Sequence, residues 1–274
     1  MSGDDVTGQD AADWWSTAIV EILPGVIRFR GYPVEELIGR VGLVDMIWLL
    51  LDGELPTAGR RRLLEAALVA SVDHGPQAPS IASARMAATT GVGLNNAVAN
   101  GINVLGDVHG GAGQQCMELY RRVAIAVDDG ADLADAAGAV VADMRATVKF
   151  VPGFGHRFHP VDPRVEPLLA LVDDAAAAGD VDGRYVHIAR AVERALATSV
   201  GTPVPMNIDG VTAVVFSELG AEPPLGRGLF VLSRAVGILA HAWEETEAGS
   251  RLKGPLPPTF LPPYTGPATR HLDG

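Results

Sequence analysis

Helical periodicity is the feature that most constrains how this 274-residue chain can fold. From Pro33 onward, one segment after another spaces apolar side chains three and four residues apart, which gives each segment one apolar face. Glycine and proline separate these segments. Hydrophobic residues make up 48% of the sequence and charged residues 20%, so a sizeable core is available. The pattern predicts a mainly helical fold.

The expected helices follow one another along most of the chain. They cover residues 33–40, 44–52, 60–72, 81–105, 112–127, 132–146, 164–176, 183–199, 209–219 and 227–245. The segment 81–105 is rich in alanine, asparagine and glycine. Because small side chains let helices approach closely, we interpret it as one tightly packed central helix.

The two ends of the chain follow other patterns. Residues 16–30 place runs rich in isoleucine and valine on either side of Pro24-Gly25, which predicts a short β hairpin. Residues 254–267 hold too many prolines for a helix and are expected to form an extended arm. Residues 1–15 begin with a polar, acidic stretch and are expected to be a flexible N-terminus.

Charge and composition exclude several classes of function. The net charge of −12 argues against binding to nucleic acid and to anionic membranes. Neither a signal peptide nor a long uninterrupted apolar run is recognisable, so we expect a cytoplasmic protein with no membrane partner. The single cysteine, Cys116, excludes a disulfide framework and is interpreted as a small buried residue.

Several histidines lie in segments that look like turns flanked by glycine, where functional groups often occur. These are His74, His109, His156 and His159, whereas His187, His241 and His271 are assigned no role. Structural alternatives stay open: His109 could be a satisfied core histidine, and His74 could cap or bridge helices. Asp209 opens a helix and could be its N-cap. No cysteine or second carboxylate completes a ligand set around His156 and His159, so no metal site is expected.

Several motifs, in order along the chain, resemble those of the citrate synthase superfamily. They are RFRGYPVEELI (28–38), LLLDGELPT (49–57), DHGPQAPS (73–80), GDVHGGAGQQ (106–115), GFGHRFHPVDPR (153–164), MNIDGVTAVVFSELG (206–220) and GLFVLSRAVGILAHAWEE (228–245). Only one expected helix separates Pro56 from Asp73. This compactness is similar to citryl-CoA lyase and to the citrate synthase homology region of ATP-citrate lyase.

The resemblance implies a helical fold with a large and a small domain inside residues 16–274. The large-domain parts would be residues 16–150 and 220–274, and the small-domain part residues 151–219. It also implies a homodimer or higher homo-oligomer with active sites completed across the interface.

The resemblance implies three catalytic groups, whose chemical types suit reactions next to a thioester. Asp209 would move the proton α to the thioester, and His109 would donate a hydrogen bond to the oxygen of the resulting enolate. If His109 lies at a helix N-terminus, the helix dipole would disfavour a positive charge on its ring. His156 would exchange a proton with the oxygen of oxaloacetate or with the tertiary hydroxyl of citryl-CoA.

The family's binding positions match further residues of this sequence. For the acid substrate they are His74, Arg157, Arg164 and Arg234. Gly153, Phe154 and Gly155 would contact the adenine of coenzyme A through their backbone. The partners implied are small molecules, namely acetyl-CoA, citryl-CoA and oxaloacetate. The coenzyme A thioester is a substrate, and no tightly bound cofactor is expected.

Two departures concern the substrate. The Arg-Pro pair usual in the family's C-terminal arm is replaced by Gly254-Pro255, with Arg251 and Lys253 nearby. Phe158-His159-Pro160 stands where a Tyr-Lys pair is usual.

The leading hypothesis is a citryl-CoA lyase. The alternatives are a citrate synthase, or a related synthase that joins an acyl-CoA to an α-keto acid and releases free coenzyme A, and a non-catalytic regulatory paralogue. The three intact catalytic groups argue against the last.

Overall fold

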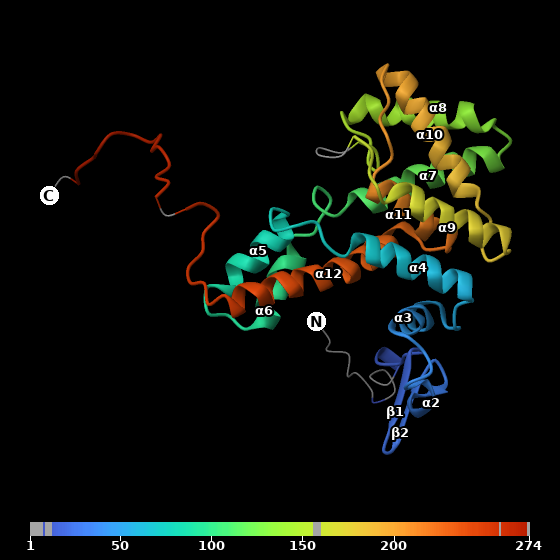
Figure 1. Cartoon of the computed structure of the whole chain (residues 1–274), viewed down its shortest axis with the longest axis horizontal. Helices are drawn as coiled ribbons and strands as arrows, with labels where there is room; N and C mark the ends of the chain where they lie inside the picture. Colours follow the sequence, from blue (N-terminus) through green and yellow to red (C-terminus); the bar gives the residue numbers. More distant parts are fainter. Residues whose placement is uncertain (1–7, 9–12, 156–159, 258, 273–274) are drawn as a thin grey trace, which may run out of the picture.

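The computed structural model describes residues 8, 13–155, 160–257 and 259–272. Within these residues the chain is mainly helical, with one small antiparallel sheet near its N-terminus (Figure 1). The predicted fold class is therefore confirmed.

The sheet contains the predicted hairpin. Strands β1 (Val20–Leu23) and β2 (Val26–Phe29) pair antiparallel around Gly25, which has a φ of 77°. A two-residue strand, β3 (Tyr32–Pro33), extends the sheet in the order β1-β2-β3. Arg30 donates from Nη2 to the carbonyl of Leu50 at 2.7 Å, which ties the hairpin to helix α3 (Leu43–Asp52).

The helices lie close to the bounds that periodicity predicts. They are α2 (Val34–Leu37), α3 (Leu43–Asp52), α4 (Ala58–Ser71), α5 (Pro79–Ala88), α6 (Leu94–Asn103), α7 (Ala112–Asp128), α8 (Leu133–Thr147), α9 (Val165–Ala177), α10 (Arg184–Val200), α11 (Ile208–Glu218) and α12 (Pro223–Glu247).

The prediction of one helix over residues 81–105 is wrong. The segment forms two helices, α5 and α6, separated by a turn in which Gly91 has a φ of 86°. A residue in this left-handed conformation cannot continue an α-helix. The inference of close packing does hold. A Cβ on Gly101 of α6 would lie 2.7 Å from Ile238 Cγ2 of α12 and 2.8 Å from the Ser80 carbonyl oxygen of α5.

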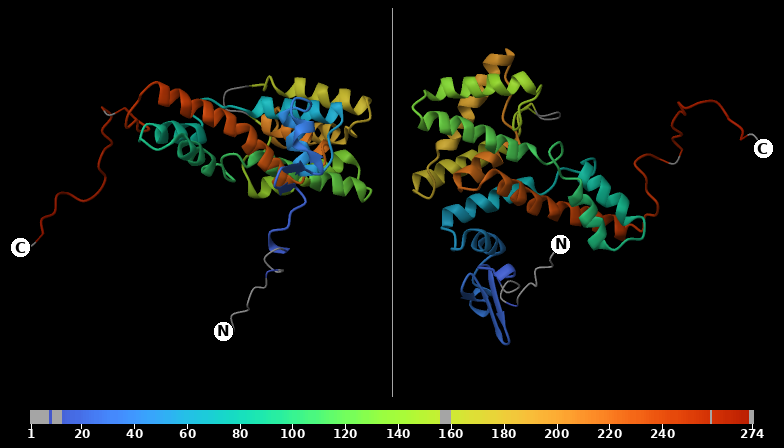
Figure 2. Two further views of the ribbon diagram at one scale, coloured as in Figure 1. Left: turned by 90° about the horizontal axis from the view of Figure 1, so that it is seen from below. Right: turned by 180° about the vertical axis from the view of Figure 1, so that it is seen from behind.

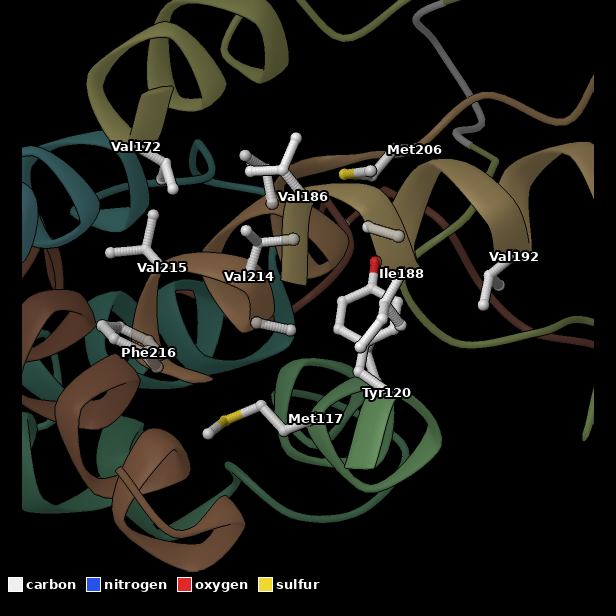
Figure 3. Packing of buried hydrophobic residues seen from close by; sticks show 14 of the residues in the cluster. Met117, Tyr120, Val172, Val186, Ile188, Val192, Met206, Val214, Val215 and Phe216 are labelled. Carbon is white, nitrogen blue, oxygen red and sulfur yellow. The ribbon is translucent and has the colours of Figure 1, made fainter. Parts of the chain in front are cut away.

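Among the described residues, buried apolar side chains form two clusters. The larger one contains residues of α3, of α4 and of each helix from α7 through α12, and Figure 3 shows Met117 and Tyr120 of α7 in the same cluster as Val214 and Phe216 of α11. The smaller one lies where α5, α6 and the C-terminal half of α12 pack together. Helix α12 runs through both clusters and thereby connects them (Figure 1). The division into large and small domains stays a prediction.

Helix α12 is long and apolar enough to cross a membrane, a test that a buried core helix also passes. Here it packs against α4, α5, α6 and α7, and its Arg234 and Glu245 are buried inside the protein. One face of α12 is therefore part of the core, whereas Leu232, Val236, Leu239 and Trp243 on its other side stay exposed.

The chain after Glu247 leaves the helical body as an extended arm (Figure 2). Its described residues contain neither helix nor strand, as the prolines predict. At its start, the backbone nitrogens of Leu252 and Lys253 donate to the carbonyl and Oγ1 of Thr89, each at 3.0 Å. The root of the arm is thus fixed to the turn between α5 and α6.

Candidate active site

His109 lies in the turn between α6 and α7, with its ring against the first turn of α5. The backbone nitrogen of Ser80 donates to His109 Nε2 at 3.1 Å, and Ser80 Oγ lies 3.0 Å from the same atom. A backbone N–H can only donate, so Nε2 must be an unprotonated acceptor. The neutral ring therefore carries its proton on Nδ1, which makes it a hydrogen-bond donor at that atom.

The surroundings of His109 keep the ring neutral. Burial and the positive charge of Arg234 lower the pKa of His109 below its ordinary value. Ser80 belongs to the first turn of α5, where the helix dipole also opposes a positive charge. This dipole is that of α5, whereas the sequence placed His109 at the start of the helix that follows it. That helix, α7, begins beyond His109 at Ala112.

Asp209 lies in the first turn of α11, and its carboxylate is not used for capping. The N-cap is Asn207, whose Oδ1 accepts from the backbone nitrogens of Asp209 at 3.0 Å and Gly210 at 3.2 Å. The structural interpretation of Asp209 as the N-cap is therefore wrong. Asp209 Oδ1 lies 4.0 Å from the position of a Cβ on Gly113, so the first turns of α11 and α7 meet at this carboxylate.

The pKa of the Asp209 carboxyl group is raised. Burial opposes its ionisation, whereas the charges of Arg234 and Arg164 favour it without fully compensating. A carboxyl group with a raised pKa is both a stronger base and a more available acid near neutral pH, which suits proton transfer to and from carbon.

Arg234 of α12 lies at the centre of this constellation. It is 5% exposed, its Nε donates to the carbonyl of Ser71 at 3.2 Å, and its guanidinium lies 4.9 Å from the centre of the Phe230 ring. Burial lowers the pKa of Arg234, and the charges of Asp73 and Asp209 raise it in opposition. The structure therefore brings Arg234 within electrostatic range of both His109 and Asp209.

Arg164 lies at the start of α9 and already binds a carboxylate of the protein. Its Nε and Nη2 donate to the two oxygens of Asp162 at 2.9 and 2.8 Å. Burial opposes ionisation of Asp162, but the hydrogen bonds from Arg164 prevail and lower the pKa of Asp162 to about 2. Asp162 also accepts from the backbone nitrogen of Ile208 at 3.0 Å, so this pair anchors the start of α11. A contact between Arg164 and substrate stays a prediction.

His74 lies exposed in the turn between α4 and α5, directly after Asp73. Asp73 Oδ2 accepts from the backbone nitrogen of Gly75 at 3.1 Å, which closes this turn. His156 and Arg157 fall outside the residues that the structure describes, between Gly155 and Pro160. The predicted roles of these three residues stay predictions.

The loop predicted to contact coenzyme A packs against the segment leading into α11. The Gly153 carbonyl accepts from the nitrogen of Asn207 at 3.0 Å, and Gly155 donates to the Pro205 carbonyl at 2.7 Å. The Phe154 ring is 7% exposed and meets Tyr120 edge to face at 6.4 Å. These contacts fix the loop beside Asp209. The predicted contact with adenine stays a prediction.

Sequence reasoning missed three residues that organise the site. Ser80 and Asn207 lie inside the motifs at 73–80 and 206–220. The motifs therefore pointed to these two positions but did not reveal what the side chains do. His241 was assigned no role, yet its Nε2 lies 3.3 Å from Asp73 Oδ1. This contact joins residues far apart in the sequence, and no local pattern announces it.

The prediction that His156 and His159 hold no metal concerns residues outside those the structure describes, and it stays a prediction. Across the described ranges, no three histidine, cysteine, aspartate or glutamate side chains gather as a metal site would require.

Comparison with proteins of known structure identifies the fold. The citryl-CoA lyase from Hydrogenobacter thermophilus is 31% identical, with a TM-score of 0.81 over 94% of this chain and 97% of that one. The ATP citrate lyase of Methanosaeta concilii, in complex with (3S)-citryl-CoA, shares the fold at 22% identity, with a TM-score of 0.74 over 98% of this chain and 45% of that one.

Sequence comparison gives the same relationship. The citrate synthase of Acidithiobacillus ferridurans is 27% identical over 225 residues, which cover 81% of this chain and 54% of that protein. The chain thus spans about half the length of this curated relative. Residues 57–255 match the family described as "Citrate synthase, C-terminal domain". By this match, which includes His109, Asp209 and Arg234, the chain belongs to the citrate synthase family.

Proposed function

We propose that this protein cleaves citryl-CoA to acetyl-CoA and oxaloacetate in a reversible reaction. The observation that carries the proposal is the likeness to the citryl-CoA lyase of Hydrogenobacter thermophilus over nearly the whole length of both chains. The arrangement of His109, Asp209 and Arg234 supports it, because these groups suit a thioester enolate and an acidic product.

The neutral His109 would stabilise the enolate. When the carbon–carbon bond of citryl-CoA breaks, its electron pair moves toward the thioester carbonyl, whose oxygen gains negative charge. The Nδ1–H of His109 can donate to that oxygen, since Nε2 is occupied by Ser80. A neutral donor of this kind stabilises the enolate without a prior proton transfer.

Asp209 would complete the cleavage by protonating the enolate carbon, which becomes the methyl group of acetyl-CoA. In the condensing direction the same carboxylate would remove that proton. The raised pKa of Asp209 favours both steps, because it makes the protonated form easier to reach and the ionised form a stronger base.

During cleavage the tertiary hydroxyl of citryl-CoA would lose its proton and become the ketone oxygen of oxaloacetate. We assign the removal of this proton to His156. Arg234 and Arg164 would hold the carboxylates of the acid, with His74 and Arg157 as further contacts. Arg234 supports this role because it is buried and positively charged beside the two proposed reacting groups. Lys253 pairs with Glu245 at 2.8 Å, so Arg251, which is exposed, is the arm cation proposed to replace the family's missing arginine.

The alternative is a citrate synthase, which would condense acetyl-CoA with oxaloacetate and hydrolyse the thioester. The curated relative from Acidithiobacillus ferridurans favours it. The two activities differ in the fate of the thioester. Incubation with citryl-CoA, and separately with acetyl-CoA plus oxaloacetate, distinguishes them by mass analysis and by thiol titration. A lyase produces acetyl-CoA from citryl-CoA without free thiol, whereas a synthase releases coenzyme A in the second incubation.

The coenzyme A thioester is proposed as a substrate, with Gly153, Phe154 and Gly155 beside its adenine, and no tightly bound cofactor is proposed. Assembly as a homodimer or higher homo-oligomer and a cytoplasmic location also stay proposals.

A further inference from the structure

A chain of polar and charged side chains connects the root of the C-terminal arm to the loop that carries His74. Its central member is His241 of α12, which was assigned no role from the sequence. It lies between Arg85 of α5 and Asp73, the residue directly before His74. None of these three side chains is among the proposed reacting groups.

The contacts of His241 define which of its nitrogens carries the proton. Arg85 Nη1 lies 3.0 Å from His241 Nδ1. A guanidinium group can only donate hydrogen bonds, so Nδ1 must accept and the ring proton lies on Nε2. Nε2 lies 3.3 Å from Asp73 Oδ1. The histidine is thus oriented to present an N–H group to this carboxylate.

Asp73 needs this partner because of where it lies. Its Oδ1 is buried and has no well-aligned hydrogen bond within the part of the chain that the structure describes. The backbone of α12 comes very close at Gly237, where a Cβ would lie 2.3 Å from the Val72 carbonyl oxygen and 3.0 Å from Asp73 Oδ1. This close approach excludes a larger side chain at position 237. His241 lies one helical turn further along the same helix, and this places its ring beside the carboxylate of Asp73.

The orientation of Asp73 bears on acid binding in two ways. Its other oxygen closes the turn at Gly75, which has a φ of 81°, and so sets the backbone path through His74. Its negative charge also acts on Arg234, together with that of Asp209. If Asp73 turned toward Arg234, it would compete with a substrate carboxylate for that guanidinium.

Arg85 is itself held in place from the other side. Its Nη2 pairs with Glu245 Oε2 at 2.6 Å, and Glu245 is buried. The second oxygen of Glu245 accepts from Lys253 Nζ at 2.8 Å, at the root of the arm. Arg85 also pairs with Glu244. The position of the histidine ring is therefore determined by several side chains from α5, α12 and the arm.

We propose that His241 is a positioning residue for acid binding: it holds Asp73 in the turn that carries His74 and keeps that carboxylate from occupying Arg234. This inference rests on the proposed function, since it takes Arg234 and His74 as the groups that bind the acid.

The test compares His241→Asn with His241→Gln. Glutamine can place an amide N–H near the position of Nε2 and reach Asp73, whereas asparagine reaches only the position of Nδ1. The dissociation constants of oxaloacetate and acetyl-CoA are measured by calorimetry. His241→Asn is expected to weaken oxaloacetate binding about tenfold. It should change acetyl-CoA binding less than about twofold, and His241→Gln should restore most of the loss.

His187→Ala is the matched control, because His187 is exposed on α10 outside this chain of contacts. Oxaloacetate binding that is unchanged in His241→Asn, or weakened equally in the asparagine and glutamine variants, would overturn the inference. So would equal losses for the two ligands. Should His241→Asn fail to fold, Arg85→Met replaces it in the test, because it removes the group that orients the His241 ring. Oxaloacetate binding should then be weaker in Arg85→Met than in His241→Gln. Equal oxaloacetate binding by these two variants would overturn the inference.

Binding and turnover separate this inference from the proposed function. A wild-type protein that binds oxaloacetate and shows the expected variant pattern, yet leaves citryl-CoA intact, would contradict the proposed function and support the role of His241. If the wild type cleaves citryl-CoA but the His241→Asn variant binds oxaloacetate normally, the proposed function is supported and the role of His241 is contradicted. A wild type that binds no oxaloacetate would overturn both.

Discussion

Ser80 fixes the protonation state of His109 through its backbone nitrogen, which donates to His109 Nε2 at 3.1 Å. The Ser80 hydroxyl, 3.0 Å from the same atom, adds a second contact. Because Ser80 belongs to the first turn of α5, the orientation of the proposed enolate donor depends on the end of a rigid helix.

Ser80→Ala removes the hydroxyl and leaves the backbone donor in place. The expected result is a fall in kcat of about three- to tenfold, with little change in KM, because the tautomer is retained while the ring is held less firmly. Steady-state kinetics with citryl-CoA measure this effect. A rise in KM at unchanged kcat would assign Ser80 to ground-state binding and contradict its proposed effect on His109.

The range of pH over which His109 stays neutral follows from its lowered pKa. Protonation of the ring places a proton on Nε2, where the Ser80 N–H already points, and so disrupts the site. Because the pKa is lowered from its ordinary value of 6.5, the neutral ring persists below that pH and is lost only on further acidification. The NMR signals of the His109 ring, assigned by their loss in His109→Gln, should therefore report a neutral ring down through pH 6.5. Protonation of this ring beginning above that value would contradict the assignment.

Asp209→Asn separates catalysis from stability. It should reduce turnover of citryl-CoA by at least about 1000-fold, because the group that transfers the proton is lost. The folded-state pKa of Asp209 is raised, so the ionised carboxylate destabilises the protein above that pKa. Asparagine removes this penalty.

The Asp209→Asn variant should therefore unfold at higher urea concentration than wild type at pH 7. The difference should vanish as the pH falls below the unfolded-state value, where both residues are neutral. Urea unfolding at the two pH values measures it. A variant that is less stable than wild type at pH 7 would contradict this. It would show that attraction to Arg234 and Arg164 stabilises the ionised carboxylate by more than burial destabilises it.

Gly153 is required by both its conformation and its contacts. It has a φ of 84°, and a Cβ there would lie 2.4 Å from Cys116 Sγ and 2.9 Å from the Gly210 Cα. Gly153→Ala should lower the free energy of unfolding by about 3 kcal/mol. Gly138→Ala is the control, since its Cβ would meet nothing within 4 Å in the middle of α8. That change should raise the free energy of unfolding by up to about 1 kcal/mol. Equal effects would contradict the packing described for Gly153.

Local patterns predicted the helices well because amphipathic periodicity requires no knowledge of the partner helix. They failed at residues 81–105, where a run of small residues reads as continuous and the left-handed Gly91 divides it. Spacing alone also made Asp209 look like the N-cap of its helix. Asn207, two residues earlier, takes that role instead. The resemblance identified Asp209 as a reacting group, which stays a prediction, and the structure shows that Asn207 caps α11 in its place.

Contacts between distant segments lay beyond sequence reasoning. Asp162 pairs with its near neighbour Arg164, but its contact with the backbone nitrogen of Ile208, 46 residues away, follows from how the start of α9 meets α11. His241 looked like an ordinary helix residue, since Asp73 and Arg85 reach it from about 160 residues away. Such pairings are determined by the packing of α12 against α5, which no single segment encodes.

Cleavage of citryl-CoA in deuterium oxide tests the central claim most directly. If the carbon–carbon bond breaks to an enolate that Asp209 protonates, the acetyl-CoA formed should carry one deuterium in its methyl group, as mass spectrometry would show, and Asp209→Asn should form almost none of this product. Acetyl-CoA without deuterium, or equal turnover by the variant, would contradict the account.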